Sequence, residues 1–382
     1  MKYFLSLVLT LLMSFAFVIP ASADVVPDAN ELIFTAINGT TSPAQTVTVT
    51  NTGAAPIQIT NVQIAGANPA SYTLTNPPGG AIVVPAGGNT AFNITFNPPG
   101  GANGVHLPAT LDITSTDPVT PVVNVGLHGL SLQGLEGANE PGLQAVVDTL
   151  GFDIDVGGAG LIIRPAPEDI NPAPGTEEIY VERFERAGAG AVSIVPVARF
   201  SPAEALPYGY YFPNGTIAPP VVTVDTMQNS AVNPINHQTL NPLTATGTTT
   251  FDPGTFHFGF FVNSLSFGRL SYTQDALNTG PRTRAARIFT LNDRNGTALP
   301  NTYLLTYEDA ANGDYQDYVY VLSNVTPAVA TAPIATDDTA TTTLNTPITV
   351  TLTTNDTGVD TNLVPATVNI VAPPNPAQGT LV

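Results

Sequence analysis

Five side chains with oxygen atoms that could bind a metal ion fall within ten residues near the end of the sequence. They are Glu308, Asp309, Asn312, Asp314 and Asp317. This stretch contains no lysine or arginine, so its carboxylates repel one another unless water or a hard cation such as Ca²⁺ neutralises them. The spacing differs from that of an EF-hand, because no Asp-x-Asp-x-Asp-Gly run occurs. We therefore predict a Ca²⁺ site at these five residues, with a solvated acidic turn as the alternative.

Two strand-like runs flank the acidic stretch and would have to position it. Thr302 to Tyr307 and Tyr318 to Leu322 are rich in Tyr, Val, Leu and Thr, which favour a pleated and half-buried surface. Asn312-Gly313 between them is a strong turn signal. We expect a hairpin that presents the acidic residues in its loop.

Other catalytic patterns are absent from the sequence. There is no cysteine, no His-x-x-x-His pair and no Gly-x-Ser-x-Gly motif, which excludes thiol chemistry and argues against the metalloprotease and α/β-hydrolase patterns. Of the scattered histidines, His257 lies in FHFGFF, where Phe256, Phe258 and Phe260 alternate with it. We predict an exposed strand histidine there.

A glycoside hydrolase needs two carboxyl groups at a set separation. Four glutamates in and beside EEIYVERFERA are candidates: Glu177, Glu178, Glu182 and Glu185. Alternation along one strand places Glu178 and Glu182 on one face, and Arg183 and Arg186 are close enough to pair with them. The sequence favours a solvated, salt-bridged strand over a catalytic pair.

Sugar-binding surfaces use aromatic rings, and this chain has no tryptophan. The run YGYYF could supply such rings through Tyr208, Tyr210, Tyr211 and Phe212, because tyrosine combines an apolar face with a hydrogen-bonding tip. Core packing is the alternative for the same residues.

The amino terminus has the pattern of a secretory signal peptide in residues 1–23. Lys2 precedes an apolar run from Phe4 to Ile19, and Ala21-Ser22-Ala23 favours cleavage after Ala23. We expect a protein that is secreted or held at the cell surface, with no membrane insertion after cleavage. Without cysteine it has neither disulfide bonds nor a lipid-modified amino terminus.

Charge and composition narrow the possible partners and the fold class. Lys2 is the only lysine, 29 residues are acidic, and the formal net charge is −19, so nucleic acid is an implausible partner. Only 10% of residues are charged, while 33 glycines and 36 prolines suit short strands joined by tight turns. We predict an all-β chain of serial β-sandwiches.

Residues 24–131 alternate between apolar and polar positions in short runs separated by turns, which is typical of a β-sandwich. Seven runs have this pattern, with VVNVGLHGL as an eighth: ELIFTAI, QTVTVTN, PIQITNVQI, SYTLT, AIVV, TAFNITF and ATLDITS. The segments TVTVTNTGAAPIQITNVQIAG, VPAGGNTAFNITFNPPG, LDITSTDP and VNVGLHG occur in that order. This order resembles the Ig-like ASPM-SPD-2-Hydin type, also termed choice-of-anchor D. The resemblance implies a packing or spacer module without catalysis.

The sequence pattern of residues 132–326 predicts one short helix, followed by a larger, jelly-roll-like sandwich. Leu143, Val146, Val147 and Leu150 have helical spacing, and Gly151 can end the helix. The block through ARIFTLNDRNGTALPNTYLLTYEDAANGDYQDYVYVLSNV resembles an uncharacterised β domain of secreted bacterial proteins. Its Glu-Asp and Gly-Asp-x-x-Asp ending is similar to domains for which calcium binding is suspected.

The composition of residues 327–335, which are rich in Pro, Ala and Thr, predicts an extended linker. Residues 336–382 follow, and with Pro-x-Ala-x-Asp-Asp at Pro333 to Asp338 they resemble the start of a bacterial cadherin-like repeat. We expect an incomplete Ig/cadherin-like unit.

These patterns together predict a non-enzymatic exported protein, at the cell surface or extracellular, that serves adhesion or structural spacing and is stabilised by Ca²⁺. Its partners would be extracellular polysaccharide or a surface protein. The alternative is a glycan-binding module or a glycoside hydrolase that acts on extracellular polysaccharide.

Overall fold

The computed structural model describes residues 25–157, 172–213, 218–229 and 236–328, together with a few positions between 339 and 349. The predicted signal peptide at 1–23 lies outside the described residues. The same is true of nearly all of the predicted linker at 327–335 and of the predicted cadherin-like repeat at 336–382, so these stay predictions.

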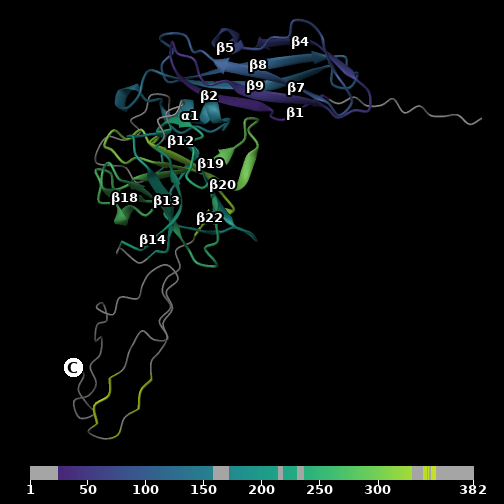
Figure 1. Ribbon diagram of the computed structural model, residues 1–382. Helices are drawn as coiled ribbons and strands as arrows, with labels where there is room; N and C mark the ends of the chain where they lie inside the picture. The colour runs from purple at the N-terminus through teal and green to yellow at the C-terminus, as the bar shows by residue number, and fades with distance from the viewer. Residues whose placement is uncertain are drawn as a thin grey trace, which may run out of the picture.

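The first unit of the fold is a β-sandwich whose two sheets enclose one core (Figure 1). The four-stranded sheet has the order β1-β3-β7-β5 and contains β1 (Val25–Pro27), β3 (Gln45–Asn51), β7 (Asn89–Phe96) and β5 (Tyr72–Leu74). The five-stranded sheet has the order β2-β9-β8-β4-β6 and contains β2 (Glu31–Ile37), β9 (Val122–Leu132), β8 (Val105–Ser115), β4 (Ile57–Ala65) and β6 (Ile82–Val84). Strand β2 runs parallel to β9, and the other neighbours pair antiparallel.

Alternation in the sequence explains this sandwich. In β3, Val47 and Val49 are buried in the core, and the intervening threonines are more exposed, as expected for a strand with one buried face. The predicted runs match eight of the nine strands, and only β1 is missed. The Ig-like β-sandwich expected here is therefore present.

Helix α1 (Leu143–Leu150) covers the outer face of the first sandwich, where it packs on β8 and β9. Its apolar residues occupy the predicted positions, and Gly151 ends it in the left-handed conformation at φ 88°. Short 3₁₀ helices precede β5, precede α1 and follow β18: η1 (Pro69–Ser71), η2 (Gly137–Asn139) and η3 (Asp275–Leu277).

The second unit is also built from sheets (Figure 1). The seven-stranded sheet has the order β10-β19-β20-β21-β12-β15, with β16 also paired to β12; its members are β10 (Glu178–Ile179), β19 (Ala286–Asn292), β20 (Ala298–Tyr307), β21 (Tyr318–Ser323), β12 (Val192–Phe200), β15 (Gln238–Leu240) and β16 (Thr250–Phe251). The four-stranded sheet has the order β14-β13-β17-β18, with β14 (Val221–Met227), β13 (Leu206–Tyr211), β17 (Gly259–Ser264) and β18 (Arg269–Tyr272). A two-stranded sheet pairs β11 (Phe184–Arg186) with β22 (Val325–Pro327).

Near the acidic loop, both faces of the seven-stranded sheet are buried. On one face Leu305 and Tyr320 pack with the four-stranded sheet. On the other face Leu304 and Val319 pack with α1 and with the end of β9. The parts of β20 and β21 next to the acidic loop, residues 304–307 and 318–320, are buried throughout, whereas β20 is exposed at Ala298, Pro300 and Asn301. The hairpin that they form is therefore held rigidly on both sides.

Candidate functional site

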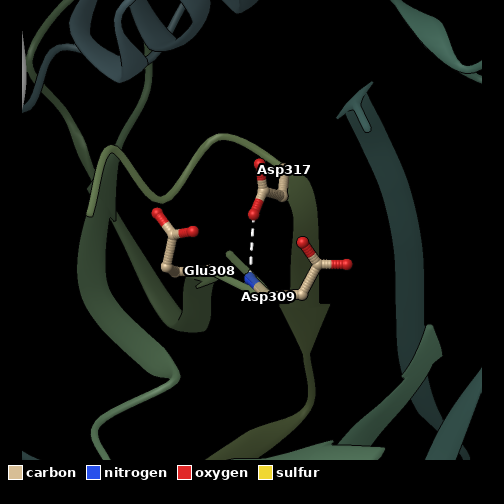
Figure 2. Close-up of side chains that lie close together, drawn as sticks. All are labelled: Glu308, Asp309 and Asp317. Carbon is tan, nitrogen blue, oxygen red and sulfur yellow. Dashed lines mark hydrogen bonds between the residues drawn. The ribbon is translucent and has the colours of Figure 1, made fainter. Parts of the chain in front are cut away.

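The acidic loop connects β20 to β21, as predicted. The two strands pair antiparallel with Tyr307 opposite Tyr318, so residues 308–317 form the connection at the end of the hairpin. Figure 2 shows Glu308 and Asp309 at the end of one strand and Asp317 at the start of the next. The rigid hairpin thus fixes three carboxylates at one place.

Glu308, Asp309 and Asp317 form a compact cluster, in which one oxygen of each lies within 4.8 Å of the others. Their exposed fractions are only 1%, 2% and 5%. The Asp309 backbone N–H donates to Asp317 Oδ2 at 2.8 Å (Figure 2), and the Tyr318 hydroxyl donates to Asp309 Oδ2. These three carboxylates are therefore buried, whereas Ala311 and Asn312 at the tip of the loop are exposed, and the Ca²⁺ site stays a prediction.

Glu308 organises the loop backbone around its own carboxylate. Its Oε2 accepts hydrogen bonds from the N–H groups of Gly313 at 2.7 Å and Asp314 at 2.9 Å, and its Oε1 accepts from Ala310 at 2.8 Å. Gly313 with φ 80° and Tyr315 with φ 57° adopt the left-handed conformation that turns these donors inward. The loop is therefore preorganised by one buried carboxylate.

Asp314 and Asn312 lie beside the three-carboxylate cluster. Asn312 is exposed, and its Nδ2 donates to Asp314 Oδ2 at 2.6 Å. Burial, followed by the charge of Glu308, raises the pKa of Asp314 to about 7. The structure therefore brings four of the five predicted residues into electrostatic contact: Glu308, Asp309, Asp314 and Asp317. The fifth, Asn312, contacts Asp314.

Burial raises the pKa of Asp317 well above its ordinary value, and the charges of Glu308, Asp309 and Asp314 add to this. Two carboxylates in one dry site oppose each other's ionisation. Either a proton or a cation must compensate the charge at Asp317 near neutral pH.

Sequence reasoning missed the residues that meet the loop from distant segments. The Arg282 guanidinium donates to the Ala311 carbonyl at 2.8 Å and passes directly over Gly313, so a cation does adjoin the loop. Glu140 and Gln316 are 176 positions apart, yet the Gln316 amide donates to Glu140 Oε2 at 3.2 Å. No local pattern in the sequence could have found these contacts.

The structure corrects the prediction of a solvated strand at EEIYVERFERA. Only Glu178–Ile179 and Phe184–Arg186 are strands, and Glu178 is buried between Arg284 at 2.7 Å and Arg287 at 2.5 Å. Alternation failed here because the backbone leaves the sheet between the two short strands.

The other three glutamates are also engaged separately. Glu177 Oε2 accepts from the Asp155 N–H at 2.6 Å, and Glu182 Oε1 accepts from the Asp275 N–H at 2.9 Å. Glu185 lies 3.3 Å from His257. The four glutamates do not converge on one site.

His257 is buried beside Glu185, so the prediction of an exposed histidine is wrong. The phenylalanines also divide differently: Phe258 and Phe260 are buried, whereas Phe256 is 66% exposed. The reason is that β17 begins only at Gly259, so the strand alternation does not extend back to Phe256.

The run YGYYF is mainly a core strand. Tyr208 and Tyr211 in β13 are fully buried, Tyr210 stacks on Phe251 at 4.1 Å, and Phe212 is 39% exposed. Core packing, the alternative for this run, accounts for two of its three tyrosines.

A cavity of about 680 Å³ lies between β2 of the first unit and residues 236–243 of the second. Ile33, Thr35 and Leu240 contribute to its walls, and Glu31 is the single acidic or basic residue among the described residues that line it. A catalytic pair of ionisable groups is therefore not found among those residues.

Among the described residues, no helix has the length and apolar character needed to span a membrane.

No protein-family model matches the chain, and no curated protein matches it. The family resemblances therefore stay predictions.

The solved structures that match the chain share little sequence with it, and their TM-scores are low. The ASH/PapD-like domain of human CEP192 is 15% identical, with 35% of this chain and 99% of that domain covered and a TM-score of 0.22. The E. coli chaperone DraB is 12% identical, with 30% of this chain and 58% of the DraB chain covered and a TM-score of 0.23. The secreted serine protease VesC from Vibrio cholerae is 12% identical, with 81% of this chain and 51% of the VesC chain covered and a TM-score of 0.26.

Proposed function

We propose that the protein is a non-enzymatic exported β-sandwich protein that serves adhesion or structural spacing and is stabilised by Ca²⁺ at the acidic loop. The observation that carries the proposal is the buried cluster of Glu308, Asp309 and Asp317 at the end of a rigid hairpin. An extracellular or cell-surface location, after cleavage behind Ala23, is part of the same proposal.

The chemistry of the cluster suits a hard divalent cation. All of its side-chain atoms that could act as ligands are carboxylate oxygens, which Ca²⁺ prefers over nitrogen or sulfur ligands. Glu308 already accepts several backbone N–H groups, so Asp309 and Asp317 carry most of the remaining capacity. Asp314 would add negative charge close by, as its coupling to Glu308 indicates.

The separate engagement of the four candidate glutamates supports a non-enzymatic role. Glu178 neutralises two buried arginines, and removing such a partner would damage the fold before it revealed any catalysis. The hydrophobic core that the two units share supports a spacer, because a shared core would hold the two units in a fixed relative orientation.

Thermal unfolding with and without calcium tests the metal site. Because an ion that binds only the folded state adds roughly 2.7 kcal/mol at a hundredfold excess over its Kd, we expect the Tm in millimolar CaCl₂ to exceed the Tm in chelator by several degrees. Asp317→Asn and Asp309→Asn should abolish this difference. Asp293→Asn, in the exposed turn between β19 and β20, is the matched control and should keep it. Equal melting temperatures for the wild type in both conditions would refute the proposal.

A glycan-binding role is the second candidate, and one surface feature favours it. Phe256 and Phe212 lie edge to face at 5.6 Å and are both exposed, and Phe212 also contacts Tyr210. Aromatic rings of this kind can pack against sugar faces. Retention on immobilised polysaccharides that is lost in Phe256→Ala would favour the binding module, and turnover lost in Glu182→Gln would favour a hydrolase.

A further inference from the structure

Two histidines lie side by side on the face of the first sandwich that α1 covers. His106 belongs to β8 and His128 to β9, and His106 Nε2 and His128 Nδ1 are 3.1 Å apart. His128 is only 8% exposed, and Leu130, two positions further along the same face of β9, packs with α1. One ring must donate a proton to the lone pair of the other, so their hydrogen bond exists only while at least one ring is neutral.

Arg294, in the turn between β19 and β20, joins the two units beside this pair. Its Nε and Nη2 donate to Glu31 Oε2 at 3.1 and 2.9 Å. Its Nη1 donates to the Asp148 carbonyl at 3.1 Å and its Nη2 to the Thr149 carbonyl at 3.2 Å, at the end of α1. His128 Nε2 lies 3.6 Å from the same Glu31 oxygen. The carboxylate oxygen that His128 faces is therefore already bound by the arginine.

The charged groups around the pair come from β2, from the side of α1 and from the second unit. Glu31 lies on β2, and Arg294 belongs to the second unit. On the side of α1, the charge of Asp148 acts on Arg294, and Asp153 lies near Asp148. If both histidines took up protons, they and Arg294 would place three positive charges around Glu31, and the positive charges would repel one another.

The surroundings favour the neutral form of both rings. Burial, followed by the charges of His128 and Arg294, lowers the pKa of His106 from 6.5 to about 4. Burial, followed by the charge of Arg294, also lowers the pKa of His128 to about 4. Because the unfolded chain binds these protons more tightly, the contribution of the pair to stability is complete above pH 6.5 and is lost as the pH falls from 6.5 towards 4.

We propose that His106 and His128 form an acid-sensitive switch at the junction of the two units, which releases the contacts of Arg294 when both rings become charged. At neutral pH both rings are uncharged, and Arg294 binds Glu31 and the end of α1. On acidification the two imidazolium groups lose their shared hydrogen bond and repel each other and Arg294. The turn between β19 and β20 then separates from α1, while the hydrophobic core that both units share keeps them attached.

The titration of the two rings tests the switch directly. NMR spectra of the full chain, with His106→Gln and His128→Gln for assignment, should give both imidazoles a pKa below about 5. Arg294→Met removes the third cation, so each pKa should rise by roughly one pH unit or more in this variant. A pKa near the ordinary value of 6.5 for both rings in the wild type would overturn the proposal.

Thermal unfolding measures the consequence for the whole fold. Between pH 7.5 and pH 4.5, the Tm of the wild type should fall by several degrees more than that of His106→Gln/His128→Gln, because glutamine keeps hydrogen-bonding groups but takes up no proton. His257→Gln is the matched control, since His257 faces Glu185 away from the junction, and it should keep the full loss. The double variant should melt within a few degrees of the wild type at pH 7.5, which shows that it is folded.

The state of Arg294 separates the switch from a general loss of stability. Its Nε–H resonance, assigned through Arg294→Met, should change between pH 7.5 and pH 4.5 in the wild type and stay unchanged in the double histidine variant. The aspartates of the acidic loop are the same in both proteins, so their titration cancels in the comparison. Equal losses of Tm in the two proteins, or an Arg294 signal that does not respond to pH in the wild type, would contradict the switch and leave the calcium proposal standing.

Discussion

Asp314 and Asp317 retain their protons to higher pH than free aspartates do, because burial and neighbouring carboxylates disfavour their ionised forms. A carboxyl group with a raised pKa in the folded state stabilises the protein below its unfolded pKa, and this stabilisation is lost as the pH rises through the folded pKa. For Asp314 that interval extends from the ordinary value of 3.8 to about 7. Calcium competes with these protons, so its affinity should rise over the same interval.

We therefore predict that the calcium-free protein loses stability between pH 5 and pH 7.5. The double variant Asp314→Asn/Asp317→Asn should show a smaller loss, because its amides do not titrate. Thermal unfolding in chelator at the two pH values measures the difference. Identical pH dependence in the wild type and the double variant would mean that these two aspartates do not titrate in this interval.

Glu178 illustrates how a buried charge differs from an exposed one. It is fully enclosed with Arg284 and Arg287, and its Oε2 also accepts the Ala173 N–H at 2.9 Å. Removing one partner of a buried ion pair leaves an uncompensated charge, which costs about 3–5 kcal/mol. We expect Glu178→Gln to lower the free energy of unfolding by about this amount.

Glu185→Gln is the matched control for Glu178→Gln. Glu185 is about half exposed beside His257, so the change should stay within about 0.5 kcal/mol. Urea unfolding of both variants gives the comparison. A similar loss in the two variants would show that Glu178 has little role in holding the arginines.

At the level of elements, α1 is an amphipathic cover for the first sandwich. It packs on β8 and β9, and Leu130 and Leu132 of β9 belong to the same core as α1. A fragment of residues 24–130 has its strands but lacks this cover. We predict that a fragment of residues 24–157 melts higher than the fragment of residues 24–130.

Binding of a hydrophobic dye provides a second readout for these fragments. The shorter fragment should bind more dye, because Ile33, Ile37 and Leu130 lose their neighbours. Val146→Asp in the longer fragment should abolish the gain in Tm, since Val146 is fully buried. Equal melting temperatures of the two fragments would show that α1 contributes nothing to the first sandwich.

The sequence predicts elements where one physical rule dominates. Strict alternation locates β2 and β3 to the residue, and helical spacing with Gly151 locates α1. The rule fails at residues 180–183, which leave the strand, and at His257, which precedes β17 and is buried beside Glu185. The acidic loop could be identified because its residues are adjacent in sequence. Glu140 and Arg282 could not, since their proximity to the loop exists only in the folded chain.

At the level of the whole molecule, the two units share a core and should unfold together. One hydrophobic cluster joins Leu130 and Leu132 to Phe289 and Leu291 of the second unit, and Arg294 pairs with Glu31 at 2.9 Å. Because neither unit keeps this core alone, we predict a single calorimetric transition for the intact protein.

The exposed ion pair should matter much less than the shared core. Arg294→Met should change the free energy of unfolding by less than about 1 kcal/mol, since the pair is partly solvated, whereas Phe289→Ala should cost about 3–5 kcal/mol. Differential scanning calorimetry measures both. Two separate transitions in the wild type would contradict the shared core.

The order of the last strands determines how the protein would respond to mechanical load. Strand β22 is only three residues long and pairs with β11 alone, whereas β21 lies between β12 and β20 in the seven-stranded sheet. Tension applied at Ala328 would act first on β22 and break its few hydrogen bonds to β11 one after another. It would then pull β21 along its own axis, loading the ladders on both sides simultaneously. Under such tension β22 would therefore detach before β21.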